Sequence, residues 1–312
     1  MKGNFKYMKT VGIACTGGGT KALSNLGVIK ALEDLGIKIS AISGTSIGSC
    51  IAVLYAIGYK TDEILDYMKY YNVEYPKFTF LDKILAPFRL LFRGGGKNPK
   101  IIEKTIRDAC IKKGKKYMCD IEIPIFIPTL DITFKETIYY SSKAIENEKY
   151  FSDRTIWEAV KNSCTLPMLY LPNNVYIDGQ LHQFLDGGMT NNTPTIHMNQ
   201  FVDVVIGIEN LYNKKISNKK VNLITGIRNT FQGMRRSAVI NQKNASTLWI
   251  SVDCDDIKII GDEKDVENCV KSGYNAVMKM YKDGCFNFIF EKETNNLNYE
   301  QKSISGPCCL RQ

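Results

Sequence analysis

Histidine and long apolar runs are scarce in this sequence. The chain has only two histidines, His182 and His197, so a Ser-His-Asp triad has few ways to be built. No segment approaches the roughly 18 apolar residues that a membrane-spanning helix needs, and the apolar run near the N-terminus is too short for a signal peptide. We therefore expect a cytoplasmic protein.

Cysteine pairs of the kind that bind zinc are also missing. The ten cysteines include no C-x-x-C pair and have no histidine nearby at ligand spacing. This pattern favours reduced thiols over a disulfide framework or a zinc site. We do not interpret the C-terminal CCLRQ as a prenylation signal, because Arg311 stands where an aliphatic residue is required.

The chain does contain enough apolar sequence for a large core. Hydrophobic residues make up 44% of the 312 residues, which suits one large domain or two small ones. The 41 Lys and Arg outnumber the 32 Asp and Glu and give a formal net charge of +9. This surplus favours an anionic partner, either a membrane surface or a nucleic acid, without choosing between them.

The order of the apolar segments predicts an α/β fold with a parallel sheet. VGIAC and IKISAIS are predicted strands, and each leads through a glycine-rich turn into a predicted helix, at 20–35 and 46–58 respectively. We predict further strands in IPIFIPTLDIT, VDVVIGIE and TLWISV. Further helices are predicted at 98–113, 154–163, 226–243 and 263–282.

The sequence GTSIG lies between the second predicted strand and its helix. It matches the G-x-S-x-G pattern of a nucleophile elbow, in which a sharp turn exposes the serine hydroxyl at the helix N-terminus. Such a turn needs small residues two positions before and after the serine, and Gly44 and Gly48 meet this need around Ser46. The alternative is an ordinary strand-to-helix turn in which Ser46 is the N-cap.

A run of three glycines, Gly17, Gly18 and Gly19, follows the first predicted strand. Backbone N–H groups at such a turn can bind a developing oxyanion, because glycine lets the reacting atom approach closely. A Walker A loop is excluded, because no Gly-Lys-Ser/Thr follows at the required spacing. The G-x-G-x-x-A pattern ending at Ala22 also resembles a dinucleotide fingerprint, but the second strand ends without the acidic residue that binds the ribose.

A serine nucleophile needs a base, and the sequence FLDGGMTNNTP offers Asp186. A carboxylate at this Gly-Gly turn is placed to accept the serine proton directly, as a dyad. Asp178, in VYIDGQL, is followed by one glycine only and is predicted to lie in a hairpin turn. A triad of Ser46, Asp186 and His197 is disfavoured, because too little chain separates Asp186 from His197 for the strand and helix that an α/β-hydrolase inserts there.

Taken in order, GGGTK, GTSIG and DGG followed by NNTP resemble the patatin-like phospholipase family, as does NSCTLPMLYLPN at 162–173. The resemblance covers roughly residues 9–210. It implies a three-layer α/β/α fold with a central, mostly parallel sheet. It also implies that Ser46 is the nucleophile and Asp186 its base. The other site residues that it implies are the oxyanion loop Gly17, Gly18 and Gly19, the elbow glycines Gly44 and Gly48, and the supporting residues Lys21, Gly187 and Gly188.

The activity implied by this resemblance is hydrolysis of fatty acyl esters in phospholipids or lysophospholipids, through an acyl-enzyme and without a metal or organic cofactor. A lipid ester is then the expected partner, and a nucleic acid is not. An acyltransferase with the same dyad and a catalytically idle lipid-binding module are the alternatives. Residues 211–312 carry no recognisable motif, and we expect them to form an extension that packs on a catalytic core at 9–210.

The segment 78–97 combines apolar residues at near-helical spacing with basic residues, and two interpretations remain open. In the first, the segment lies on a membrane surface, with Phe88 among the lipid chains and Arg89 and Arg93 near the phosphates. In the second, it is a helix that covers the core and is kinked at Pro87. The first interpretation would make the protein a peripheral membrane protein.

Overall fold

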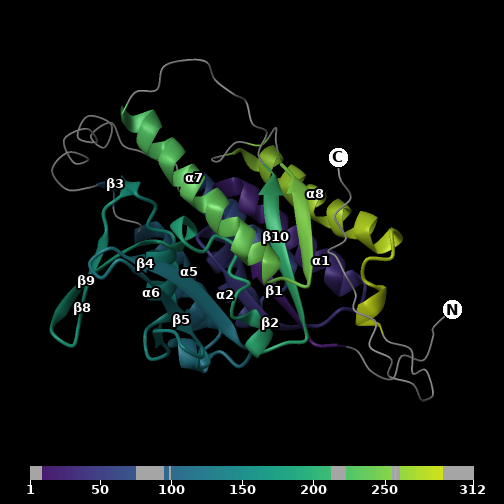
Figure 1. The fold of residues 1–312 in the computed structure, drawn as a ribbon, viewed down its shortest axis with the longest axis horizontal. Coiled ribbons are helices and arrows are strands. Elements are labelled where there is room, and N and C mark those ends of the chain that lie inside the picture. Colours follow the sequence, from purple (N-terminus) through teal and green to yellow (C-terminus); the bar gives the residue numbers. More distant parts are fainter. Residues whose placement is uncertain are drawn as a thin grey trace.

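The computed structural model describes residues 9–74, 95–97, 100–211, 223–254, 257 and 261–290. The strands in these ranges are β1 (Val11–Cys15), β2 (Ile39–Gly44), β3 (Gly95–Lys97), β4 (Ile125–Asp131), β5 (Glu136–Ser141), β6 (Tyr150–Phe151), β7 (Met168–Tyr170), β8 (Asn173–Ile177), β9 (Gln180–Asp186), β10 (Val204–Leu211) and β11 (Leu248–Asp253). Nine of them form one sheet in the order β11-β10-β1-β2-β4-β5-β6, with the hairpin β8–β9 joined to β4 (Figure 1). β3 and β7 form a separate pair.

The centre of this sheet is parallel, as the sequence predicts. β11, β10, β1, β2 and β4 pair in parallel with one another, whereas β5 and β9 pair antiparallel with β4. The central strands β1 and β10 are buried along nearly their whole length, which suits a sheet covered on both faces. The predicted α/β class with a mostly parallel sheet is confirmed.

Helices cover one face of the sheet and enclose the larger core. The described helices are α1 (Ser24–Asp34), α2 (Ile47–Ala56), α3 (Thr61–Glu74), α5 (Lys100–Lys112), α6 (Ile156–Ser163), α7 (Leu223–Asn244) and α8 (Glu263–Lys282). Buried apolar side chains of α1, α2, α3, α5, α6 and α8 belong to the larger core, together with Ile13 of β1 and Ile206 of β10. The neighbouring strand residues Ala14 and Val205 belong instead to a smaller cluster with Met198 and Val202, on the opposite face.

Three local features differ from the sequence prediction or extend it. The first turn of the helix predicted at 20–35 is a 3-10 helix, η1 (Gly19–Leu23), because Gly18 and Gly19 enter it with φ angles of 149° and 62°. Helix α3 and strand β5 are additions that the sequence analysis did not predict. The turn predicted at Asp178 is present, and it joins β8 to β9 with positive φ at Asp178 and Gly179.

The register around β4 explains how distant parts of the chain meet. β2 pairs with the start of β4, where Ser43 lies opposite Phe126, and beyond this point β2 no longer pairs with β4. Further toward the end of β4, β9 pairs with the same edge of β4, and Asp186 lies opposite Thr129. Thr129 lies three residues beyond Phe126, as Ser46 lies three residues beyond Ser43. The end of β9 is therefore level with the turn that follows β2.

Elements after residue 211 join the same body. β11 pairs with β10, and α8 packs along α1, where Gly27 and Gly273 let the two helix backbones approach so closely that a Cβ at either glycine would overlap the other helix. In Figure 1, α7 crosses in front of the strands. Among the described helices, none has the length and apolar character needed to cross a membrane.

Candidate active site

Ser46 occupies a strained turn between β2 and α2. Its φ of 54° and ψ of −130° lie outside the regions that ordinary L-residues prefer, as expected for a nucleophile elbow. The neighbouring glycines are sterically required. A Cβ at Gly48 would lie 2.6 Å from the carbonyl oxygens of Cys15 and Thr16, and a Cβ at Gly44 would overlap the backbone of Gly48. The local sequence therefore permits a conformation that larger residues would prevent.

Asp186 ends β9 in a buried position, with 3% of its surface exposed. Its backbone N–H donates to the carbonyl of Thr165 at 2.8 Å. Its Oδ1 accepts the N–H of Gly188 at 2.7 Å, and a Cβ at Gly187 would overlap the backbone of Pro128. The two glycines after Asp186 thus have separate roles, since one allows close packing against β4 and the other supplies a donor to the carboxylate.

Ser46 and Asp186 are brought together in this structure. The side chain of Ser46 lies close enough to the Asp186 carboxylate to lower its pKa. Burial raises the pKa of Asp186 to about 6, against the opposing effects of the Ser46 side chain, of the bond from Gly188 and of the positive charge of Arg235. A carboxyl with this pKa is mostly ionised at neutral pH and still returns a proton readily, which is what a general base in a serine hydrolase must do.

The glycine loop lies against Ser46, since a Cβ placed on Gly17 would lie 3.2 Å from the Ser46 Cβ. The N–H of Gly17 donates to the carbonyl of Asn192 at 3.1 Å and is therefore engaged, contrary to its expected role as an oxyanion donor. Gly18 is the N-cap of η1 and Gly19 its first residue, so their N–H groups belong to the end of a helix, where intrahelical acceptors are missing. These two groups are the candidates for binding an oxyanion.

Three buried asparagines hold this loop. Asn25 donates to the carbonyls of Thr16 and Ala22 and accepts the N–H of Thr16. Asn192, in the predicted NNTP motif, donates to the Thr16 hydroxyl at 2.6 Å. Asn210, at the end of β10, donates to the carbonyl of Lys21, which is itself buried. Asn25 and Asn210 carry no sequence signal, because their partners are backbone groups that only the fold brings near.

Arg235 of α7 also reaches the loop, and sequence reasoning missed it. Its guanidinium donates to the carbonyl of Gly17 at 2.8 Å and exerts its charge on Asp186. The MRRS sequence around it resembles ordinary basic surface, so no motif marks it. The predicted membrane contacts Phe88, Arg89 and Arg93 lie outside the residues that the structure describes.

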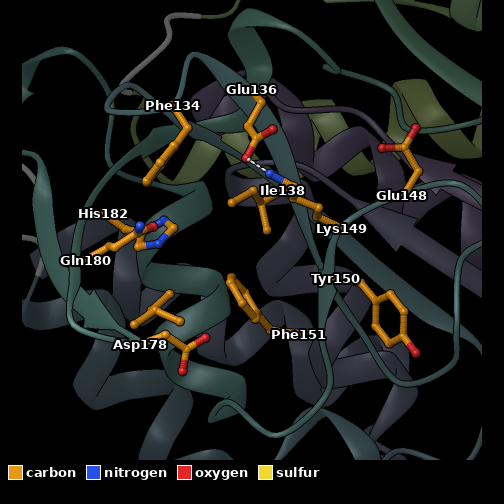
Figure 2. A pocket seen from close by; sticks show the side chains of 11 residues that line it. Phe134, Glu136, Ile138, Glu148, Lys149, Tyr150, Phe151, Asp178, Gln180 and His182 are labelled. Carbon is orange, nitrogen blue, oxygen red and sulfur yellow. Dashed lines mark hydrogen bonds and ion pairs between the residues drawn. The ribbon is translucent and has the colours of Figure 1, made fainter.

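Both histidines pair with carboxylates other than Asp186. His182 Nδ1 lies 2.5 Å from Oδ2 of the buried Asp131. His182 lines a surface pocket of about 460 Å³ whose lining residues include neither Ser46 nor Asp186. Figure 2 shows His182 among the residues of this pocket. His197 Nε2 lies 3.2 Å from Glu148, and burial lowers the pKa of His197. Neither histidine is therefore placed as the third member of a triad with Ser46 and Asp186.

The eight cysteines in the described residues are free thiols. Cys50 and Cys164 lie behind the elbow, with their sulfur atoms 3.9 Å apart. Burial raises the pKa of Cys164 well above its usual value, and the nearby Asp186 charge acts in the same direction. The Cys164 thiol is therefore neutral beside the carboxylate.

Known proteins with similar sequences place this arrangement in a family. The model of the patatin-like phospholipase family matches residues 13–198. Patatin-like phospholipase domain-containing protein 6 of Mus musculus is 31% identical over 190 residues, which are 59% of this chain and 12% of that protein. Lysophospholipase NTE1 of Kluyveromyces lactis is 31% identical over 201 residues, which are 62% of this chain and 12% of that protein.

The matched region is thus a small part of these curated relatives. A crystal structure of VipD from Legionella pneumophila superposes on 88% of this chain and 67% of its own chain, with a TM-score of 0.50 at 13% identity. This likeness concerns the fold alone. The family model, in contrast, matches more than half of the sequence in hand and includes both Ser46 and Asp186. This chain therefore belongs to the patatin-like phospholipase family.

Proposed function

We propose that this protein is a lipid acyl hydrolase of the phospholipase A or lysophospholipase type, acting through a dyad of Ser46 and Asp186. One observation carries the proposal: a serine in a strained, glycine-flanked turn lies close enough to a buried carboxylate to act on its pKa, which burial raises to about 6. The relatives named phospholipase and lysophospholipase support a lipid ester as the substrate.

In the proposed reaction, Ser46 Oγ attacks the ester carbonyl while Asp186 takes the hydroxyl proton. The carbonyl oxygen gains negative charge and is bound by the N–H groups of Gly18 and Gly19. Collapse of the tetrahedral intermediate breaks the ester bond, and Asp186 gives its proton to the departing alcohol. The fatty acyl group then remains on Ser46 as an ester.

Water completes the cycle. Asp186 accepts a proton from water as the water oxygen attacks the acyl carbon, and the second tetrahedral intermediate collapses to a free fatty acid. Asp186 returns the proton to Ser46 Oγ, which restores both groups. No step needs a metal or an organic cofactor.

The positive charge supports a site of action at an anionic lipid surface. A net charge of +9 attracts such a surface, so we infer a cytoplasmic protein that associates peripherally with membranes. Residues 9–210 would form the catalytic core. The part after residue 210 would be an extension packed on it through β11 and α8.

The test is a lipid panel assayed with purified full-length protein, with fluorophosphonate labelling in parallel. We expect release of free fatty acid from phospholipid or lysophospholipid vesicles, and stoichiometric labelling at Ser46 that Ser46→Ala abolishes. Acyl transfer to an added alcohol in place of fatty acid release would favour an acyltransferase. Absence of both labelling and turnover would favour the alternative of a catalytically idle lipid-binding module.

A further inference from the structure

Helix α7 contacts both loops of the candidate active site. Arg235 and Gln242 are seven residues apart, which places them on the same face of the helix, two turns from each other. The Arg235 guanidinium donates to the Gly17 carbonyl at 2.8 Å. Gln242, fully buried, accepts the N–H of Thr193 at 2.9 Å, in the loop that follows Asp186. One rigid element thus reaches the glycine loop and the aspartate loop together.

The bond to Gly17 has a consequence for Gly18. The carbonyl of Gly17 and the N–H of Gly18 belong to one planar trans peptide group, in which they point in opposite directions. Holding the carbonyl therefore sets the direction of the N–H. That N–H is one of the two donors proposed for the oxyanion, so Arg235 acts on it through the peptide group.

The Gly17–Gly18 peptide group needs a restraint from outside the loop. It lies between two glycines, and Gly18 has a φ of 149°, in a region that other residues rarely adopt. Glycine on both sides lowers the steric barrier against rotation of the peptide, which would change the direction of the Gly18 N–H. The adjoining N–H of Gly17 is anchored by Asn192 at 3.1 Å, so the loop is held on one side by Asn192 and on the other by Arg235.

Arg235 also acts on the base. Its positive charge lowers the pKa of Asp186, which burial raises. The other groups that bear on this carboxylate are the Ser46 hydroxyl, the Gly188 N–H and the neutral Cys164 thiol, none of which is positively charged. Loss of the guanidinium charge should therefore raise the pKa of Asp186 further.

We propose that Arg235 is a positioning residue of the active site, which fixes the Gly17–Gly18 peptide so that the Gly18 N–H faces the developing oxyanion and keeps Asp186 ionised. The catalytic part of this inference rests on the proposed hydrolase function. The structural part, the restraint of the glycine loop by α7, is independent of it. It gives the segment after residue 211 a role that its sequence does not reveal.

The kinetic test compares Arg235→Gln and Arg235→Lys with Arg236→Gln, an exposed neighbour on the same helix. On a small soluble ester at pH 8, we expect Arg235→Gln to lower kcat about 10- to 100-fold with little change in KM, which is less than the roughly 100- to 1000-fold cost of removing an oxyanion donor outright. The acid limb of its kcat/KM profile should move to higher pH. Arg235→Lys, which keeps the charge, should restore the position of that limb and part of kcat, while Arg236→Gln should match the wild type.

Amide hydrogen exchange of the glycine loop provides a measurement that does not depend on activity. Peptides covering residues 16–22 should exchange faster in Arg235→Gln than in the wild type or Arg236→Gln, at equal thermal stability. If the wild type hydrolyses no ester, the hydrolase proposal fails, and this exchange measurement still decides the restraint. The inference would be overturned if hydrogen exchange of the glycine loop were the same in Arg235→Gln as in the wild type. It would also be overturned if the wild type were active and Arg235→Gln changed neither kcat nor the pH of the acid limb.

Discussion

The carboxylate of Asp186 accepts the backbone N–H of Gly188 at 2.7 Å, and the side chain of Ser46 lies close enough to the same carboxylate to lower its pKa. These two groups lie on different elements, the turn after β9 and the elbow after β2. The carboxylate therefore joins the two motifs, and the energetic cost of burying it is offset only in part, since its pKa stays raised at about 6. This relationship leads to predictions about activity, pH and stability.

Removal of either dyad member should abolish turnover. We expect Ser46→Ala and Asp186→Asn each to lower kcat/KM at least about a thousandfold, because the proposed reaction needs both the nucleophile and its base. Initial rates on a lysophospholipid would measure this. Asp178→Asn, at an exposed carboxylate in the β8–β9 turn, is the matched control and should stay active. Near-normal hydrolysis by a folded Asp186→Asn protein would mean that the base is wrongly assigned.

The activity should fall below pH 6. Asp186 accepts a proton only when ionised, and its pKa is raised to about 6, so kcat/KM should rise with pH through an apparent pKa near 6 and then level off. A pH series on a neutral soluble ester separates this effect from any change in lipid charge. An acid limb near pH 4, the range of an ordinary aspartate, would contradict the buried carboxylate.

The same pKa has an opposite effect on stability. The folded-state value of about 6 exceeds the unfolded value of 3.8, so ionised Asp186 lowers the free energy of unfolding by about 3 kcal/mol above pH 6. This cost is absent below pH 3.8, where the group is neutral in both states. Asp186→Asn should therefore gain stability relative to the wild type as pH rises from about 4 to 7. Urea unfolding of both proteins at pH 4 and pH 7 measures this gain. A difference in the free energy of unfolding between Asp186→Asn and the wild type that does not change with pH would refute the prediction.

The histidines should be dispensable for the chemistry. His182 and His197 pair with Asp131 and Glu148, away from the dyad, so His182→Ala and His197→Ala should each retain turnover within about tenfold of the wild type. His182→Ala removes the imidazole that pairs with Oδ2 of the buried Asp131, so the melting temperature of this variant should be measured beside its activity. Loss of turnover in a folded His197→Ala protein would revive the Ser-Asp-His triad.

The elbow glycines should tolerate no side chain. A Cβ at Gly48 would lie 2.6 Å from two backbone carbonyl oxygens, which belong to a central strand and its turn and cannot easily move. We expect Gly48→Ala to lose about 1–3 kcal/mol of stability and more than tenfold in kcat. Gly233→Ala on α7, where a Cβ meets nothing within 4 Å, is the control and should be neutral or slightly stabilising. Equal melting temperatures for both variants would contradict the steric argument.

Sequence alone was sufficient for what depends on neighbouring residues. The alternation of apolar runs and glycine-rich turns predicts β1, β2, α2 and the parallel sheet, because periodicity and turn chemistry are local properties. The glycines around Ser46 and the Gly-Gly pair after Asp186 are detectable for the same reason, since glycine is itself a local turn signal, although the backbones that Gly48 and Gly187 approach lie in other segments. The family resemblance rests on these local motifs.

Tertiary structure decided which of these motifs meet and what else joins them. Asp186 lies close to Ser46 because β9 pairs with β4 just beyond the residues that pair with β2. This register depends on pairing between segments that are distant in the sequence. The engagement of the Gly17 N–H by Asn192 and of its carbonyl by Arg235 likewise joins groups far apart in the chain. Such contacts leave no periodic trace in the sequence, because a single backbone carbonyl can be bound by any donor that the fold happens to bring within reach.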